Sequence, residues 1–251
     1  MLCSADGLRR RLLAAALAVM LGVALRSPAG AAAGPESTPP FGLPFGGEPG
    51  PSTWLMGQMY GNTTSAHRQA LRWYAAGQGL HFGIDVLAPC GTPVLSIGDG
   101  DVVQADWTAR GSGPHNLVVR HPEHAVTVLY GHLLERPDFA PGDRVSRGAI
   151  VGLSGDPDET CVSRPHLHLE IRSLDYRTAH NPAAWIDADW DALMLLGPFS
   201  DVHFARDRSD PLRWVRPEDQ PDVRFGGALL NDYPEVWPAE SADAVCVAVG
   251  C

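Results

Sequence analysis

The stretch Arg164–Arg172 reads RPHLHLEIR, and its alternation predicts a β-strand. In a β-strand, successive side chains point to opposite sides of the sheet, so residues two apart share a face. His166, His168 and Glu170 therefore share one face of the expected strand, and the aliphatic residues that alternate with them share the other. The aliphatic face is expected to pack on a core, which leaves two imidazoles side by side on the opposite surface. Two histidines on one rigid face are typical of a metal site or a general base.

Short apolar runs separated by turn residues surround this stretch. The runs are Thr92–Ile97, Asp101–Ala105, Asn116–Arg120, Val126–Tyr130, Ile150–Leu153 and Leu167–Ile171. Strands at this spacing, without long helices between them, indicate a mainly antiparallel all-β domain. The 27 glycines and 22 prolines of the chain also suit many turns better than long helices. We therefore predict a compact antiparallel β-sheet or sandwich domain at about residues 52–190.

The N-terminus has the pattern of an export signal. Arg9, Arg10 and Arg11 precede the apolar stretch Leu12–Leu25, which is shorter than the about 20 residues that a membrane-spanning helix needs. A run of small residues ending at Ala33 supplies a cleavage site, so residues 1–33 are predicted to be a signal peptide, with an uncleaved anchor as the alternative. The mature protein is then expected in the cell envelope or outside the cell, without stable membrane insertion. Both the general secretory and the twin-arginine route stay open.

Two further segments flank the predicted domain. Residues 34–51 are dense in proline and glycine and are predicted to form a linker or arm. Residues 191–251 are predicted to be an irregular C-terminal extension, to which the composition assigns no role. Two short helices are expected, over residues 66–76 and 185–196.

The charged residues of the chain limit the classes of catalysis and of binding partner that are expected. All 19 basic residues are arginines, so lysine-based covalent catalysis is excluded. Removal of residues 1–33 leaves 15 arginines against 28 acidic residues, a net charge of −13. Such an acidic chain should repel nucleic acid and anionic membrane surfaces. No nucleic-acid partner is expected, and the sequence does not predict the oligomeric state.

Four cysteines remain after removal of the signal: Cys90, Cys161, Cys246 and Cys251. An even number in an exported protein favours disulfides over free thiols. Four cysteines allow three pairings, and the count alone does not choose among them. A link between Cys246 and Cys251 would pin the C-terminal extension.

Two more segments carry histidines. In HFGID, read as a strand, His81 and Asp85 share a face with Gly83, which leaves room for a metal between them. In LYGHL, a predicted strand ends at His132, on the face of Tyr130. Each of these segments alone is a weak signal, because such pairs also occur on solvated surfaces.

Together the histidine segments supply the parts of a catalytic zinc site. Such a site needs three protein ligands and keeps one position for water. His81, Asp85 and one histidine of the pair His166 and His168 would provide the ligands for one zinc ion per chain. The remaining imidazoles would then handle protons. The sequence contains no nucleophile elbow, dinucleotide-binding fingerprint or P-loop that would compete with this interpretation.

Five motifs occur in the order found in a known family: HFGIDVLAPCGTPV, GDGDVV, YGHL, PGDRVSRGAIVG and PHLHLE. On these motifs, the region from His81 to about Asp187 resembles the catalytic domain of the lysostaphin/LytM-type zinc metallopeptidases, which cleave peptide bonds in bacterial peptidoglycan. The resemblance implies a secreted zinc metalloendopeptidase that hydrolyses stem peptides or cross-bridges of peptidoglycan. It also implies a compact antiparallel β fold with the site in a groove.

The resemblance assigns a role to each site residue. The zinc ligands would be His81, Asp85 and His168. The two unliganded catalytic histidines would be His132 and His166. Two alternatives stay open: a non-catalytic relative that binds the cell wall or activates an amidase, and a secreted metalloprotease that acts on other peptides. Non-catalytic relatives typically lack ligands, whereas this sequence keeps the full set.

The loop before PHLHLE departs from the family. The family has a glycine-rich loop there, and this chain has GDPDETCVSR over residues 155–164. Loops at the edge of a groove usually select the substrate, so the substrate is where this chain is expected to differ. Cys90 and Cys161 flank the two ligand segments, and we predict that these two cysteines pair.

Overall fold

The computed structural model of the chain describes residues 38–110, 113, 115–196, 205–210 and 212–232. The predicted signal peptide and the cysteines Cys246 and Cys251 lie outside the described residues.

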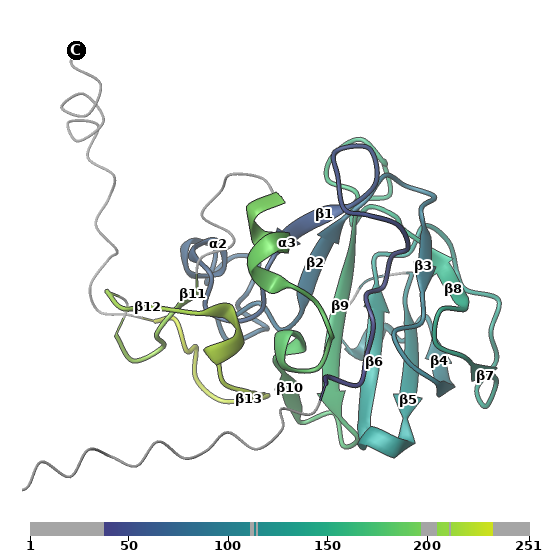
Figure 1. Cartoon of the computed structure of the whole chain (residues 1–251). Helices are drawn as coiled ribbons and strands as arrows, with labels where there is room; N and C mark the ends of the chain where they lie inside the picture. The colour runs from purple at the N-terminus through teal and green to yellow at the C-terminus, as the bar shows by residue number, and fades with distance from the viewer. Residues whose placement is uncertain (1–37, 111–112, 114, 197–204, 211, 233–251) are drawn as a thin grey trace, which may run out of the picture. The chain divides into compact units, whose positions relative to one another are not determined.

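A nine-stranded sheet dominates the structure (Figure 1). Seven strands lie side by side in the order β1 (Leu55–Gln58), β2 (Ile84–Leu87), β9 (His166–Ser173), β6 (Val126–Gly131), β5 (Leu117–His121), β4 (Gly100–Ala105) and β7 (Arg144–Val145). The remaining two are β10 (Thr178–His180), which pairs with β9, and β13 (Val223–Arg224), which pairs with β10. Two small sheets join β3 (Pro93–Leu95) to β8 (Ile150–Leu153) and β11 (Ala205–Arg206) to β12 (Trp214–Val215). The pairs are antiparallel, which confirms the predicted all-β fold class.

Helices are short in the described part of the chain. There are two α-helices, α2 (Thr64–Arg68) and α3 (Trp190–Leu196), and four 3₁₀ turns, η1 (Thr108–Arg110), η2 (Pro122–His124), η3 (Pro182–Ala184) and η4 (Pro217–Asp219). The helix expected over residues 66–76 therefore ends early. At its end the Ala70 N–H bonds to the His67 carbonyl, three residues back, in place of a carbonyl four residues back. Beyond it the Gln69 carbonyl accepts N–H groups from residues 72, 73 and 74, so the chain continues in turns. The helix expected from residue 185 begins late, after Asp189 accepts the Ala192 N–H as an N-terminal cap.

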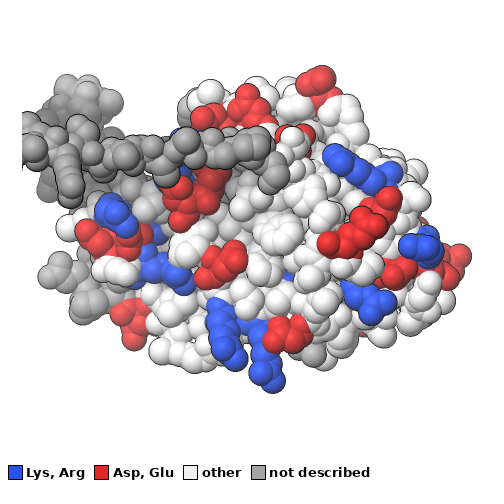
Figure 2. Space-filling model, turned by 60° about the horizontal axis from the view of Figure 1, so that its bottom comes forward, with Lys and Arg blue, Asp and Glu red and all other residues white. Residues whose placement is uncertain are grey.

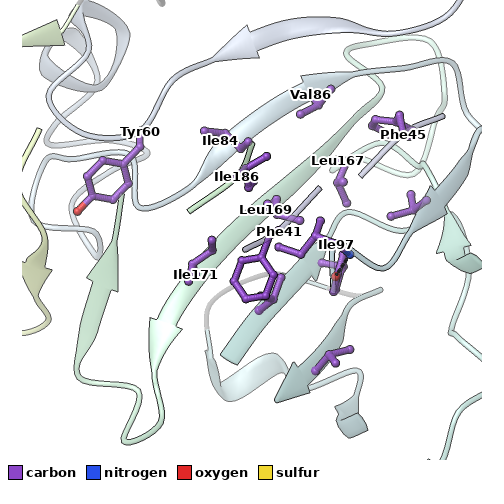
Figure 3. Close-up of a cluster of buried hydrophobic side chains, with 14 of the residues drawn as sticks. Phe41, Phe45, Tyr60, Ile84, Val86, Ile97, Leu167, Leu169, Ile171 and Ile186 are labelled. Atoms are coloured by element: carbon purple, nitrogen blue, oxygen red, sulfur yellow. Dashed lines mark hydrogen bonds between the residues drawn. The ribbon is translucent and has the colours of Figure 1, made fainter. Parts of the chain in front are cut away.

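The hydrophobic core lies on one face of the large sheet (Figure 3). The alternating aliphatic residues of β2 and β9 all have fully buried side chains: Ile84, Val86, Leu167, Leu169 and Ile171. Phe41 and Phe45, within the predicted linker, are buried in the same core. Burial of a side chain of this size contributes about 1.5–3 kcal/mol, so residues 38–51 belong to the packing of the domain.

The segment 205–232, from the predicted C-terminal extension, also packs on the domain. The Asn181 side-chain amide donates to the Pro217 and Gln220 carbonyls, and the Tyr60 hydroxyl donates to the Pro221 carbonyl. Strand β13 adds to the edge of β10. These contacts bring residues of this segment next to the histidine-bearing face of β9.

The surface charge and the helix lengths of the described residues are relevant to binding partners and membranes. On the face drawn in Figure 2, acidic and basic side chains are interspersed, with no continuous patch of either sign. Among the described residues, no helix has the length and apolar character needed to cross a bilayer.

Candidate active site

The register between β2 and β9 brings two of the predicted ligands together. Asp85 lies directly opposite His168, as Ile84 lies opposite Leu169. Residues directly opposite each other in an antiparallel pair share a face. The Asp85 carboxylate and the His168 imidazole therefore meet on the side away from the core, and Asp85 Oδ1 lies 2.8 Å from His168 Nδ1.

His81 reaches the same point from outside the strand. Strand β2 begins only at Ile84, so the prediction that the whole HFGID segment forms one strand is wrong for its first three residues. His81 is held instead by two backbone hydrogen bonds with Gly61. Its Nε2 atom lies 3.1 Å from Asp85 Oδ1 and 3.2 Å from His168 Nδ1. The three predicted ligands thus converge although they do not share a regular strand.

Gly83 is required by a close approach of two backbone segments, in addition to the room for a metal that we predicted. A Cβ atom at this position would lie 2.3 Å from the Leu169 carbonyl oxygen and 2.9 Å from Glu170 Cγ. Only glycine lets the chain approach β9 this closely before β2 begins. Gly83 therefore acts on the site by positioning His81 and Asp85 against β9.

Hydrogen bonds on the outer side of the two imidazoles fix their tautomers. His81 Nδ1–H donates to the Met59 carbonyl at 2.9 Å, and His168 Nε2–H donates to Glu170 Oε1 at 2.9 Å. When the imidazoles are neutral, their inner nitrogens therefore carry lone pairs, and these nitrogens face Asp85 Oδ1. Three electron-rich atoms this close together repel one another unless a cation or a proton lies between them.

A zinc ion fits this donor set. The candidate ligand atoms of His81, Asp85 and His168 all lie within 4.8 Å of one another. Tetrahedral zinc with bonds of about 2.0–2.2 Å separates its ligand atoms by roughly 3.3–3.6 Å, so the present distances need only a small expansion. The carboxylate of Glu170 behind His168 is the outer partner that zinc-ligating histidines usually have.

The ionisation of the site matches a cation-binding role. Burial by itself would raise the pKa of Asp85, but the neighbouring histidines, led by His81, hold it well below its usual range. Burial would lower the pKa of His168, but hydrogen bonds and charges from Asp85 and Glu170 outweigh it and raise this pKa to about 10. Against the effect of burial, Arg172 and His168 lower the pKa of Glu170 to about 2. Both carboxylates are therefore ionised, and a metal would displace the His168 proton.

His132 enters the site through an unusual backbone conformation. We predicted from the alternation along β6 that His132 lies on the face of Tyr130. The Tyr130 side chain lies in the core. Instead, His132 has a φ of 57°, in the left-handed region that few residues other than glycine adopt. The chain turns there, and the His132 ring centroid lies 4.8 Å from that of His166 and 5.7 Å from that of His168. The prediction of its face was wrong because this turn breaks the period of two.

The two histidines outside the donor set also line the cleft. His166 Nδ1–H donates to the Arg164 carbonyl at 2.7 Å, which leaves a lone pair on Nε2, 3.7 Å from Asp85 Oδ1. Burial, with the charges of His168 and His166, lowers the pKa of His132 to about 3. His132 is therefore a neutral imidazole at pH 7.

These groups open into a cleft with a volume of about 730 Å³. Five aromatic residues that the sequence interpretation gave no role in the site also line it: Trp73, Tyr74, Phe82, Tyr176 and Phe225. The Tyr74 hydroxyl donates to Gln58 Oε1 at 3.0 Å, and burial raises its pKa to about 12, so it stays protonated. The adjacent aromatic residues at 73 and 74, in a segment rich in polar residues and glycine, were the only sequence signal for this wall.

Cys90 and Cys161, the pair that we predicted, are joined by a disulfide with a Cα–Cα distance of 5.8 Å. Cys161 lies in the loop that departs from the family pattern, and this loop forms part of the cleft wall through Pro157 and Arg164.

Part of the chain that contains this site matches a known protein family. Residues 79–182 match the sequence model of Peptidase family M23. This region of the chain is similar to the peptidases of family M23. This match confirms the resemblance to the lysostaphin/LytM-type peptidases. The matched region contains the three convergent donors and both further histidines, whereas Trp73, Tyr74 and Phe225 lie outside it.

Two curated enzymes are similar to part of this chain. The glycyl-glycine endopeptidase ALE-1 of Staphylococcus capitis is 34% identical over 111 residues, which cover 43% of this chain and 29% of the relative. The peptidoglycan DD-endopeptidase ShyA of Vibrio cholerae is 38% identical over 91 residues, which cover 36% of this chain and 20% of the relative. The chain thus spans less than a third of the length of these two relatives. Among solved structures, the catalytic domain of lysostaphin from Staphylococcus simulans aligns at 27% identity with a TM-score of 0.42, covering 52% of this chain and 90% of that domain.

Proposed function

We propose that this protein is an exported zinc-dependent metalloendopeptidase that hydrolyses peptide bonds in the stem peptides or cross-bridges of bacterial peptidoglycan. The observation that carries the proposal is the convergence of three metal donors with two further histidines in one cleft, all five within the region that matches family M23. Two relatives are named for endopeptidase activity, one of them on peptidoglycan. Export rests on the predicted signal peptide, residues 1–33.

His81, Asp85 and His168 would hold the ion, one per chain. Zinc, when bound, would activate water and polarise the carbonyl of the scissile peptide bond. The protein would contribute the orientation of the ligands, because Met59 and Glu170 fix both imidazoles from behind. Such outer hydrogen bonds keep the ligand atoms in place before the metal arrives.

His132 and His166 would move the protons. Peptide hydrolysis requires one proton to leave the attacking water and one to reach the departing amine. His166 offers the lone pair of Nε2, and the His132 ring lies within 4.8 Å of the His166 ring on the same cleft. One imidazole can therefore accept a proton from the attacking water, and an imidazole that has taken up such a proton can deliver it to the departing amine. Loss of a general acid or base typically lowers the rate by about 10²–10⁴-fold.

The test uses the mature protein loaded with zinc, with purified sacculi of several cross-link types as substrates and mass spectrometry of the released fragments. Wild type should release peptide fragments. His132→Ala and His166→Ala should keep one zinc per chain and lose about 10²–10⁴-fold in rate, whereas His168→Ala should lose the metal. His124→Ala, at an exposed position in η2, is the matched control and should change neither quantity.

Each alternative function gives a different result. A non-catalytic wall-binding or amidase-activating relative would leave all sacculi intact at full zinc occupancy. A metalloprotease for other peptides would leave sacculi intact and cleave unrelated peptides. Full zinc content in His168→Ala would contradict the assignment of the ligands.

A further inference from the structure

One wall of the cleft holds an arginine that the reaction above does not use. Arg164 and Trp73 both line the cleft, and the guanidinium carbon of Arg164 lies 5.1 Å from the centroid of the Trp73 ring. Arg72 packs on the same ring at 5.2 Å. The Trp73 side chain is 53% exposed, so both guanidinium groups lie at the solvent-facing edge of the cleft. A guanidinium stacked on an aromatic ring is held in orientation while its N–H groups remain able to donate.

The charge of Arg164 is not balanced within the cleft. The other ionic groups in the lining engage one another, since Glu170 pairs with Arg172 and with His168, and Asp85 pairs with His81 and His168. Among the described residues, no carboxylate lies within ion-pairing distance of the Arg164 guanidinium. An exposed cation in a cleft of this acidic chain is a ready partner for an anionic group of a ligand.

The backbone that carries Arg164 is fixed before any ligand binds. Its N–H donates to Asp156 Oδ2 at 3.2 Å, and its carbonyl accepts the Nδ1–H of His166 at 2.7 Å. The disulfide at Cys161 ties the same loop to Cys90. Arg164 thus stands on a rigid base directly before β9, two residues from His166.

Arg164 also lies close to the reacting groups. After burial and the charges of two histidines, its charge is a further cause that lowers the pKa of His132. Arg164 lies four positions before His168 in the chain, which limits the distance between their Cα atoms to roughly 13 Å. A peptide that places its scissile bond at the metal donors could therefore reach Arg164 with a side chain or terminus a few residues away.

We propose that Arg164, held against Trp73, binds a carboxylate of the substrate a few residues from the scissile bond. The substrate class is then an anionic stem peptide and not a neutral glycine cross-bridge. A carboxylate is the anion that a peptide substrate itself carries, and it accepts two parallel N–H bonds from a guanidinium. This inference rests on the proposed function and specifies the substrate of the same site.

The experiment compares two synthetic cross-linked stem peptides that differ only in free carboxylates or carboxamides. Hydrogen bonds to charged groups contribute enough that wild type should favour the carboxylate peptide by about 10- to 100-fold in kcat/KM. Arg164→Gln should abolish this preference, mainly through KM, while the zinc content stays at one per chain. Arg164→Lys should keep part of it, because an ammonium is a point charge without the planar fork. Arg144→Gln, exposed on β7, removes the same charge elsewhere and should leave the preference intact.

A preference that survives in Arg164→Gln, or equal cleavage of the two peptides by wild type, would overturn the inference and leave the proposed function standing. Failure of wild type to cleave either peptide or any sacculus would instead remove the proposed function. Calorimetric binding of the two peptides to zinc-loaded His132→Ala then decides the role of Arg164 without hydrolysis. Equal affinity for both peptides in that assay would again overturn it.

Discussion

Glu170→Gln would show how much the carboxylate behind His168 supports the metal site. Glu170 is 5% exposed and uses both oxygens, accepting Nε2–H of His168 at 2.9 Å and Nε–H of Arg172 at 2.6 Å. Glutamine keeps the shape but replaces one acceptor oxygen by a donor and removes the charge. Loss of such an outer partner typically weakens metal binding by about 10- to 100-fold. Arg172 would lose its buried anion, which costs about 3–5 kcal/mol of unfolding free energy.

A double variant separates these two effects. In Glu170→Gln combined with Arg172→Met, the unpaired buried charge is gone, so most of the lost stability should return while zinc affinity stays reduced. Zinc affinity is measured by competition with a chromophoric chelator at one pH, and stability by urea unfolding after metal removal. Wild-type zinc affinity in Glu170→Gln, or recovery of both quantities in the double variant, would refute this account of Glu170.

Two predictions concern the stability of the scaffold. Replacing Cys90 and Cys161 by serine opens a link between residues 71 positions apart and should lower the unfolding free energy by about 4 kcal/mol; a loss below about 1 kcal/mol in urea unfolding would contradict a role for loop closure. Burial lowers the pKa of His121 from its ordinary 6.5, so the unfolded chain takes up this proton first as the pH falls. Stability should then decrease below about pH 6.5 by at most about 1.4 kcal/mol per pH unit from this residue. His121→Gln should flatten that part of the profile, and identical profiles for the two proteins would speak against it.

The strand pattern was predictable because the period of two follows from covalent geometry. The stretch beginning at His166 alternates without interruption, and β9 presents its imidazoles opposite the core as expected. Helix lengths were less predictable, since α2 ends early where the Ala70 N–H bonds to the His67 carbonyl, three residues back. The helix propensities of single residues do not predict which carbonyl each backbone N–H bonds to.

The sequence by itself determined which residue types could form the site and which of them share a face of β9. Only the tertiary structure decided that Asp85 lies opposite His168, that His81 joins them from outside a strand, and that the left-handed backbone at His132 brings its ring into the cleft. It also decided that Trp73 lies against Arg164. The reason is that register and long-range contacts depend on how segments far apart in the chain pack together, whereas alternation depends only on neighbouring residues.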